Sequence, residues 1–257
     1  MSEKPLRNKV AIITGASRGI GKGIALAYAD AGADLVLAAR SVGDLEKTAE
    51  EAERRGVRAM VAKMDAYHID EVESVIAQTQ SQFGRIDVLV NNAGGSRNVE
   101  GGWLGFLDTS HRALEELFRL NVFSPYVAAQ AAARVMKNQG GGVIINITSI
   151  FAFYPSAKVQ PYSAAKGALQ ELTKLWAVEL GPFQIRVNAI APGPVESAQI
   201  DKIATTQEIR AAIAAAVPLG RIGRPEDIGH LAVFLASDQA SWISGAAILA
   251  GGGAYYQ

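Results

Sequence analysis

The chain contains no cysteine among its 257 residues. This absence excludes a disulfide framework, a thiol nucleophile and a thiolate metal site. Histidine is scarce as well: His68, His111 and His230 are far apart in the sequence and lack the close spacing of zinc ligands. We therefore expect no metal centre and interpret the three histidines as surface or packing residues.

The sequence also lacks an excess of charge of either sign. Lys and Arg together number 25, as do Asp and Glu, so the formal net charge is zero. Nucleic acids and anionic membranes attract proteins with an excess of basic residues, so we expect neither as a partner. No uninterrupted apolar run approaches the ~20 residues that cross a bilayer. Residues 1–5 begin no apolar signal segment, and we expect a cytoplasmic protein.

What the sequence does contain is a regular alternation of apolar strands and amphipathic helices. Strands that are near-continuously apolar are typical of a parallel sheet covered on both faces. The pattern predicts an α/β fold: one Rossmann-type domain over residues 1–257, with a doubly wound parallel sheet of about seven strands. The expected strands are 10–13, 35–39, 59–62, 88–90, 143–147, 186–190 and 246–249, and the expected helices include 45–55, 71–83, 114–136, 162–180 and 225–235.

A glycine-rich turn follows the first expected strand. It reads Thr14-Gly15-Ala16-Ser17-Arg18-Gly19-Ile20-Gly21 and leads into a helical pattern that stops at Gly32. Glycines let the backbone approach a pyrophosphate closely, and the free N–H groups of a helix N-terminus attract its charge. Such loops also close ordinary turns, but the position between a buried strand and a helix favours nucleotide binding.

Tyr162 and Lys166 lie four residues apart, and Ser149 lies thirteen residues before the tyrosine. Positions i and i+4 share one helix face, so the phenol and the ammonium project together. An ammonium ~4 Å from a phenol supplies about 4 kcal/mol at an effective dielectric near 20. That energy lowers a tyrosine pKa by roughly 3 units. The spacing therefore predicts proton transfer at an alcohol oxygen that Ser149 also contacts, although the same spacing occurs on exposed amphipathic helices.

Together these motifs resemble the short-chain dehydrogenase/reductase family over nearly the whole chain. The matching segments follow the family's order: Thr14-Gly15-x-x-x-Gly19-x-Gly21, Asn91-Asn92-Ala93-Gly94, Asn121, Ser149, Tyr162 with Lys166, and Pro192-Gly193. The resemblance implies hydride transfer between a nicotinamide cofactor and a carbonyl carbon. Tyr162 is then the acid or base, Ser149 fixes the oxygen, and Lys166 lowers the tyrosine pKa and holds the nicotinamide ribose. Asn121 matches the family asparagine that anchors a water leading from the lysine to solvent.

The end of the second expected strand indicates which nicotinamide cofactor is bound. An NAD site of this kind usually has an acid there that accepts from the ribose 2′-hydroxyl, but this sequence reads Ala38-Ala39-Arg40-Ser41. Arg18 is expected to approach the same corner. Two charge-assisted hydrogen bonds of about 1.5–3 kcal/mol each favour a 2′-phosphate by around a hundredfold or more. We therefore predict NADP(H).

The resemblance assigns further cofactor contacts. Asp65 is expected to meet the adenine amino group, although its position also suits a cap on the helix that follows. Asn91, Ala93 and Gly94 are expected along the adenosine ribose, and Val195 near the nicotinamide carboxamide. The complete expected cofactor set is Gly15, Ser17, Arg18, Gly19, Ile20, Gly21, Arg40, Ser41, Asp65, Asn91, Ala93, Gly94, Tyr162, Lys166, Pro192, Gly193, Val195 and Ser197.

Three segments, 95–106, 150–161 and 194–217, are expected to line the substrate pocket. Their apolar and aromatic composition predicts a bulky hydrophobic ketone or its secondary alcohol as substrate. Several segments, among them Ala240-Ser241-Trp242-Ile243-Ser244-Gly245, are similar to bacterial hydroxysteroid dehydrogenases. The candidate lining residues are Trp103, Leu104, Phe106, Ile150, Phe151, Phe153, Tyr154, Ile200 and Ile203.

Two other functions stay open. The length and the C-terminal pattern also resemble 3-oxoacyl-[acyl-carrier-protein] reductases. Those reductases carry basic residues for an acidic carrier, whereas the two corresponding places here read Asn138-Gln139-Gly140-Gly141-Gly142 and Gly181-Pro182-Phe183-Gln184. A non-catalytic nucleotide-binding scaffold is expected to lose the tyrosine or the lysine, and this chain has both. Family members commonly pair their long helices across a twofold axis, so the resemblance implies a homotetramer.

Overall fold

The computed structural model describes residues 4–96, 104–154, 156–157 and 159–254. Within these residues, seven parallel strands form one sheet in the order β3-β2-β1-β4-β5-β6-β7. The order reverses between β1 and β4, and ligands of such sheets bind at this switch point. The strands are β1 (Val10–Thr14), β2 (Asp34–Ala39), β3 (Ala59–Lys63), β4 (Val88–Asn91), β5 (Gly142–Ile147), β6 (Ile185–Pro192) and β7 (Ala247–Ala250).

The predicted fold class is confirmed, and all seven expected strands are present. Their observed ends differ from the expected ones by at most two residues. The prediction worked because the central strands are buried on both faces, which demands an uninterrupted apolar run. Every residue of β1 and β4 is buried, for example.

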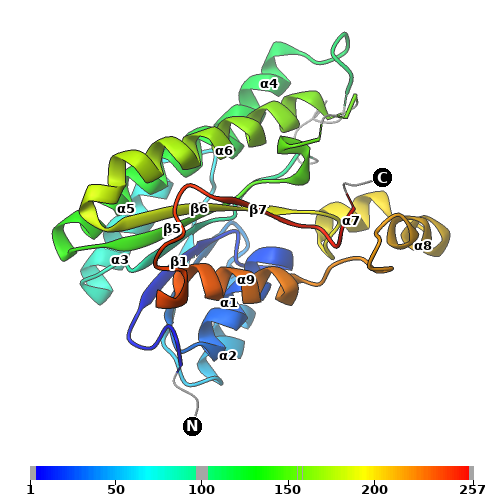
Figure 1. The fold of residues 1–257 in the computed structure, drawn as a ribbon. Helices are drawn as coiled ribbons and strands as arrows, with labels where there is room; N and C mark the ends of the chain where they lie inside the picture. Colours follow the sequence, from blue (N-terminus) through cyan, green and yellow to red (C-terminus); the bar gives the residue numbers. More distant parts are fainter. Residues whose placement is uncertain (1–3, 97–103, 155, 158, 255–257) are drawn as a thin grey trace.

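Helices cover both faces of the sheet (Figure 1). One core cluster joins Ile13 to α1 (Gly19–Asp30), α2 (Val42–Glu53) and α9 (Pro225–Ala236). The other joins Ile12 to α3 (Ile69–Phe83), α5 (Ser124–Gln139) and α6 (Gln160–Leu180). Successive residues of a strand point to opposite faces, so the adjacent isoleucines of β1 belong to separate cores.

Helices α1 and α9 pack so closely that glycine is required where they meet. A Cβ on Gly23 would lie 2.5 Å from Cβ of Pro225, and a Cβ on Gly229 would lie 2.7 Å from the Gly23 carbonyl oxygen. Pro225 opens α9 as expected, and the Asp227 carboxylate accepts from the Arg224 backbone N–H at 2.7 Å. The helix predicted over residues 225–235 is therefore confirmed.

The single helix expected over residues 114–136 was wrong. The chain instead forms α4 (His111–Phe118), a π-helical turn at Arg119–Phe123, and then α5. The Asn121 side chain lies inside this turn, where its amide donates to the Leu117 carbonyl at 2.9 Å. π turns are rare and occur mostly as single turns inside α-helices, so the continuous helical pattern of the sequence did not predict this one.

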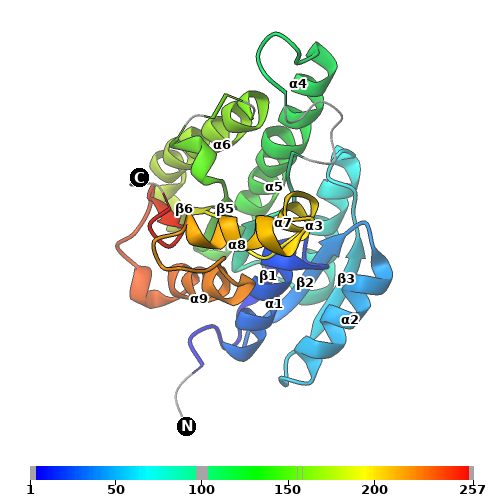
Figure 2. The same cartoon turned by 90° about the vertical axis from the view of Figure 1, so that its right-hand side faces the viewer.

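Two short helices, α7 (Ala198–Ile203) and α8 (Gln207–Ala215), lie in front of the carboxyl ends of the strands (Figure 2). They follow β6 and cover the carboxyl ends of the strands, where the glycine turn also lies. In the described ranges, no helix is both long enough and apolar enough to span a membrane. In the same ranges, no three His, Cys, Asp or Glu side chains gather in a metal-binding group.

Candidate active site

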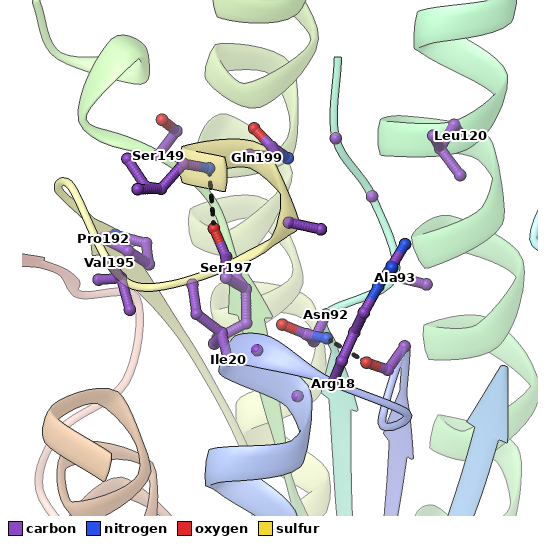
Figure 3. A pocket seen from close by; sticks show the side chains of 18 of the residues that line it. Arg18, Ile20, Asn92, Ala93, Leu120, Ser149, Pro192, Val195, Ser197 and Gln199 are labelled. Carbon is purple, nitrogen blue, oxygen red and sulfur yellow. Dashed lines mark hydrogen bonds between the residues drawn. The ribbon is translucent and has the colours of Figure 1, made fainter. Parts of the chain in front are cut away.

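A cavity of about 830 Å³ lies at the carboxyl ends of the strands, beneath α7 (Figure 3). Its lining comes from segments that are far apart in the sequence: the β1–α1 turn, the end of β2, the loops after β3, β4 and β5, the first turns of α6, and the loop after β6. All residues of the expected catalytic and cofactor sets line this cavity except Asn91 and Asn121. The topology therefore gathers segments that are far apart in the sequence around one volume.

The β1–α1 turn has the geometry of a phosphate cradle. Gly15 and Gly19 have φ values of 70° and 55°, which are left-handed conformations that favour glycine. The cavity also meets the N-terminus of α1, which begins at Gly19 and has no acidic residue in its first turn. This end of the cavity therefore fits the pyrophosphate of a dinucleotide.

Asn92 and Thr14 brace this turn, a role the sequence motif did not reveal. The Asn92 amide donates to the carbonyl oxygens of Thr14 and Gly15 at 2.8 and 3.2 Å. The Thr14 hydroxyl oxygen accepts from the backbone N–H groups of Asn92 and Ala93 at 3.0 and 2.9 Å. The glycine turn and the loop after β4 are therefore held as one unit.

Gly21→Ala is expected to destabilise the fold and impair nucleotide binding. A Cβ at this position would overlap the Gly15 carbonyl oxygen and the Asn92 amide nitrogen, so the phosphate turn must move. Overpacking of this kind costs roughly 1–3 kcal/mol. Gly43→Ala is the matched control, because a Cβ there meets nothing within 4 Å and alanine favours the helix. Urea denaturation compares the two, and equal stability of both variants would contradict the packing argument.

Ser149, Tyr162 and Lys166 meet in the middle of the cavity, and all three side chains are buried. Ser149 lies two residues after the end of β5 and caps a 3₁₀ turn, while Tyr162 and Lys166 lie in the first turns of α6. Ser149 hydrogen-bonds the Tyr162 hydroxyl. The Lys166 ammonium donates to the Ile147 carbonyl at 2.8 Å and lies 5.8 Å from the centre of the tyrosine ring. The expected cluster therefore forms.

The protonation of this cluster differs from the expectation. Burial raises the pKa of Tyr162 to about 12, opposed by the hydrogen bond from Ser149. Burial lowers the pKa of Lys166 to about 7. The resemblance implies that Lys166 lowers the pKa of Tyr162, but in this structure burial of the phenol has the largest effect and raises that pKa. The phenol is therefore protonated at neutral pH.

Asn121 lies behind the catalytic cluster and does not line the cavity. Its side chain pairs with the backbone of Gly95, accepting from the N–H and donating to the carbonyl, each at 3.0 Å. A Cβ on Gly94 would lie 2.8 Å from the Asn121 Oδ1 and 3.1 Å from the Lys166 Nζ. The asparagine is thus next to the lysine, as its place in the family motif implies.

Asn91 is the last residue of the central strand β4; its side chain is buried and does not line the cavity. Its amide donates to the Asn146 side chain at 2.9 Å and to the Pro125 carbonyl at 3.3 Å. Asn146 donates in turn to the Thr173 hydroxyl at 2.9 Å. These contacts join β4, β5 and α6, and the neighbouring Asn92, Ala93 and Gly94 line the cavity instead.

At the adenosine end, Arg18, Arg40 and Ser41 line the cavity as expected. The hydroxyl of Ser41, one of the expected cofactor contacts, donates to the Asp44 carboxylate at 2.8 Å. Asp65 also lines the cavity and accepts from the Tyr67 backbone N–H at 3.1 Å. It does not cap α3, whose N-cap residue is His68.

The substrate half of the cavity is mostly apolar. Ile150, Phe151, Ile200 and Ile203 line it, as expected, and Ile213 of α8 joins them. The expected Leu104, Phe106, Phe153 and Tyr154 do not line it, and Phe106 is 77% exposed. Trp103 lies outside the described residues. Gln199 of α7 was missed: its side chain reaches so near Gly95 that a Cβ there would lie 2.6 Å from the amide nitrogen.

A doubly wound sheet with a phosphate turn and a buried Ser–Tyr–Lys cluster defines a nicotinamide-dependent oxidoreductase. A family profile described as "Enoyl-(Acyl carrier protein) reductase" matches residues 15–255. The chain belongs to the short-chain dehydrogenase/reductase family, whose members are oxidoreductases that act on CH–OH groups. The resemblance of the sequence motifs is thereby confirmed.

Relatives with different substrates align over nearly the whole chain. The 7α-hydroxysteroid dehydrogenase of Escherichia coli K12 is 37% identical, covering 96% of this chain and 94% of its own. A 3-oxoacyl-[acyl-carrier-protein] reductase of Thermotoga maritima is 33% identical, covering 96% and 98%. A solved structure of 7α-hydroxysteroid dehydrogenase, complexed with NADH and 7-oxo glycochenodeoxycholic acid, has a TM-score of 0.91 at 36% identity, covering 98% and 96%.

Proposed function

We propose that this protein is an NADP(H)-dependent oxidoreductase that interconverts a hydrophobic ketone and its secondary alcohol. The observation that carries the proposal is the buried cluster of Ser149, Tyr162 and Lys166, in the same cavity as the glycine turn. The arrangement suits reaction at a carbonyl group because the hydroxyl groups of Ser149 and Tyr162 lie next to each other in the cavity.

The residues of the cluster have separate tasks in ketone reduction. Ser149 and Tyr162 donate hydrogen bonds to the carbonyl oxygen, which polarises the carbonyl group. Tyr162 then gives its proton to the oxygen as the C–H bond forms, and takes it back in alcohol oxidation. When bound, the nicotinamide cofactor supplies or accepts the hydride. Lys166 replenishes the tyrosine proton and offers its ammonium to ribose hydroxyls, with Asn121 behind it.

The apolar wall supports a hydrophobic substrate. Ile150 and Phe151 follow the catalytic serine, and three isoleucines of α7 and α8 lie in the cover. Such a wall binds hydrocarbon area at roughly 25 cal/mol per Å². The similarity to 7α-hydroxysteroid dehydrogenases supports the same class of bulky ketone.

The test compares two carbonyl substrates. NADPH oxidation is followed with a keto-steroid and with a β-ketoacyl thioester, and kcat/KM is expected to be at least about tenfold higher for the keto-steroid. That ratio corresponds to about 1.4 kcal/mol of preferential transition-state binding. A preference for the thioester would contradict the proposal and favour a 3-oxoacyl-[acyl-carrier-protein] reductase, a class that also contains relatives of this chain.

A further inference from the structure

The adenosine end of the cavity contains an acid at an unexpected place. The residue at the end of β2, where an NAD site usually has its acid, is Ala39. Asp44, in the first turn of α2, lines the cavity together with Arg18, Arg40 and Ser41. The corner that was expected to hold only cations and a hydroxyl therefore also contains a carboxylate.

The Asp44 carboxylate accepts the hydrogen bond that the Ser41 hydroxyl would otherwise donate to a phosphate. The Ser41 hydroxyl donates to the Asp44 Oδ2 at 2.8 Å, and Lys47 donates to the Oδ1 at 3.4 Å. Ser41 is the N-cap residue of α2, but its side chain makes no capping hydrogen bond. A hydroxyl has one proton to donate, so Ser41 cannot donate to Asp44 and to a ligand at once.

Asp44 also opposes the charge of this corner. The hydrogen bonds from Ser41 and Lys47 lower the pKa of Asp44, and the nearby charge of Arg18 lowers it further. The carboxylate is thus ionised at neutral pH. Its side chain is 49% exposed, which leaves oxygen lone pairs accessible at the rim of the cavity.

We propose that Asp44 limits the preference for a 2′-phosphate that Arg18 and Arg40 create. The carboxylate repels a phosphate and holds the Ser41 proton, whereas it accepts a hydrogen bond from an unmodified 2′-hydroxyl. This inference rests on the proposed function, because it requires the adenosine ribose to bind at this corner. A carboxylate about 4 Å from a group with −1.5 to −2 charges weakens its binding by roughly tenfold even in water.

The test measures binding of two adenosine probes by calorimetry. Adenosine 2′,5′-bisphosphate and adenosine 5′-monophosphate are titrated into the wild type, Asp44→Asn and the control Glu46→Gln. Glu46 is an exposed residue of the same helix that does not line the cavity. Asp44→Asn is expected to raise the affinity ratio in favour of the bisphosphate about tenfold, and Glu46→Gln to change it less than twofold. The ratio of kcat/KM for NADPH over NADH is expected to rise in parallel.

The calorimetry distinguishes failure of the role proposed for Asp44 from failure of the proposed NADP(H) preference. A ratio in Asp44→Asn within twofold of the wild type overturns the inference. Equal binding of the two probes by the wild type, with comparable kcat/KM for NADPH and NADH, contradicts the NADP(H) preference whatever the variant does. The folded state of each variant is checked by thermal melting. Asp44→Ala is the second variant, and it must shift the ratio in the same direction as Asp44→Asn.

Discussion

Replacing Tyr162 with phenylalanine is expected to reduce kcat for ketone reduction at least ~10²-fold, the usual scale for loss of a general acid. The phenol carries a proton at neutral pH, since burial raises its pKa to about 12, and it is hydrogen-bonded to Ser149. Phenylalanine keeps the ring, which packs edge-to-face on Phe151 at 6.4 Å, and therefore keeps the shape of the cavity.

The sign of the pH dependence gives a second readout of Tyr162. Ketone reduction needs the protonated phenol, which persists far above neutral pH, so its rate should not fall between pH 7 and about 10 through this group. Alcohol oxidation needs the phenolate, so its kcat/KM should rise over the same range. Tyr126→Phe is the control, since Tyr126 is 43% exposed on α5 and does not line the cavity. A near-wild-type kcat in Tyr162→Phe would overturn the assignment.

Lys166→Met is expected to abolish most activity and at the same time stabilise the fold. The ammonium is buried, and its pKa falls from 10.5 to about 7, a burial cost on the order of 4 kcal/mol at neutral pH. Methionine has a similar volume and no charge, but it loses the hydrogen bond to the Ile147 carbonyl. We therefore expect a net gain of roughly 2 kcal/mol in the free energy of unfolding at pH 7, with kcat lowered at least ~10²-fold.

The pH profile of stability tests the same residue. Between the folded pKa of about 7 and the unfolded value of 10.5, the unfolded state binds more protons at Lys166 than the folded state. The free energy of unfolding contributed by this group therefore rises with pH through that window, and Lys166→Met removes the rise. Lys174→Met is the control, because Lys174 is 53% exposed and pairs only with Glu171 among the described ion pairs. Identical pH profiles of wild type and Lys166→Met would contradict the buried charge.

The strands and the catalytic cluster could be predicted because each depends on local spacing. Buried strands need continuous apolar runs, and Tyr162 with Lys166 needs only one helical turn. The cover helices α7 and α8 were not predicted, although Ser197 and Thr206 accept hydrogen bonds from Ile200 and Ile209 as N-cap residues. These caps were visible as Ser and Thr, but helices this short have too few turns for a clear apolar period.

The remaining errors involve side chains whose partners are distant in the sequence or not set by the motif. Asn91 turns toward Asn146, 55 residues away, and no local pattern shows that choice. Asn92 braces the glycine turn from 78 residues away. Asp44 was not singled out from the sequence, because the acid that binds the ribose in NAD sites is expected at the end of β2, whereas Asp44 lies in the first turn of α2. For the two asparagines the sheet topology, not the motif, decides which groups meet, whereas Asp44 meets Ser41 within the first turn of α2.

The most direct test of the account is transfer of deuterium from NADPH labelled at both C4 positions to a bulky ketone. The wild type is expected to yield an alcohol with one deuterium on the carbinol carbon, as shown by mass spectrometry. Labelling both positions makes the result independent of which face of the nicotinamide reacts. NADPH binding with no labelled alcohol from either a keto-steroid or a β-ketoacyl thioester would contradict the account and leave a nucleotide-binding scaffold.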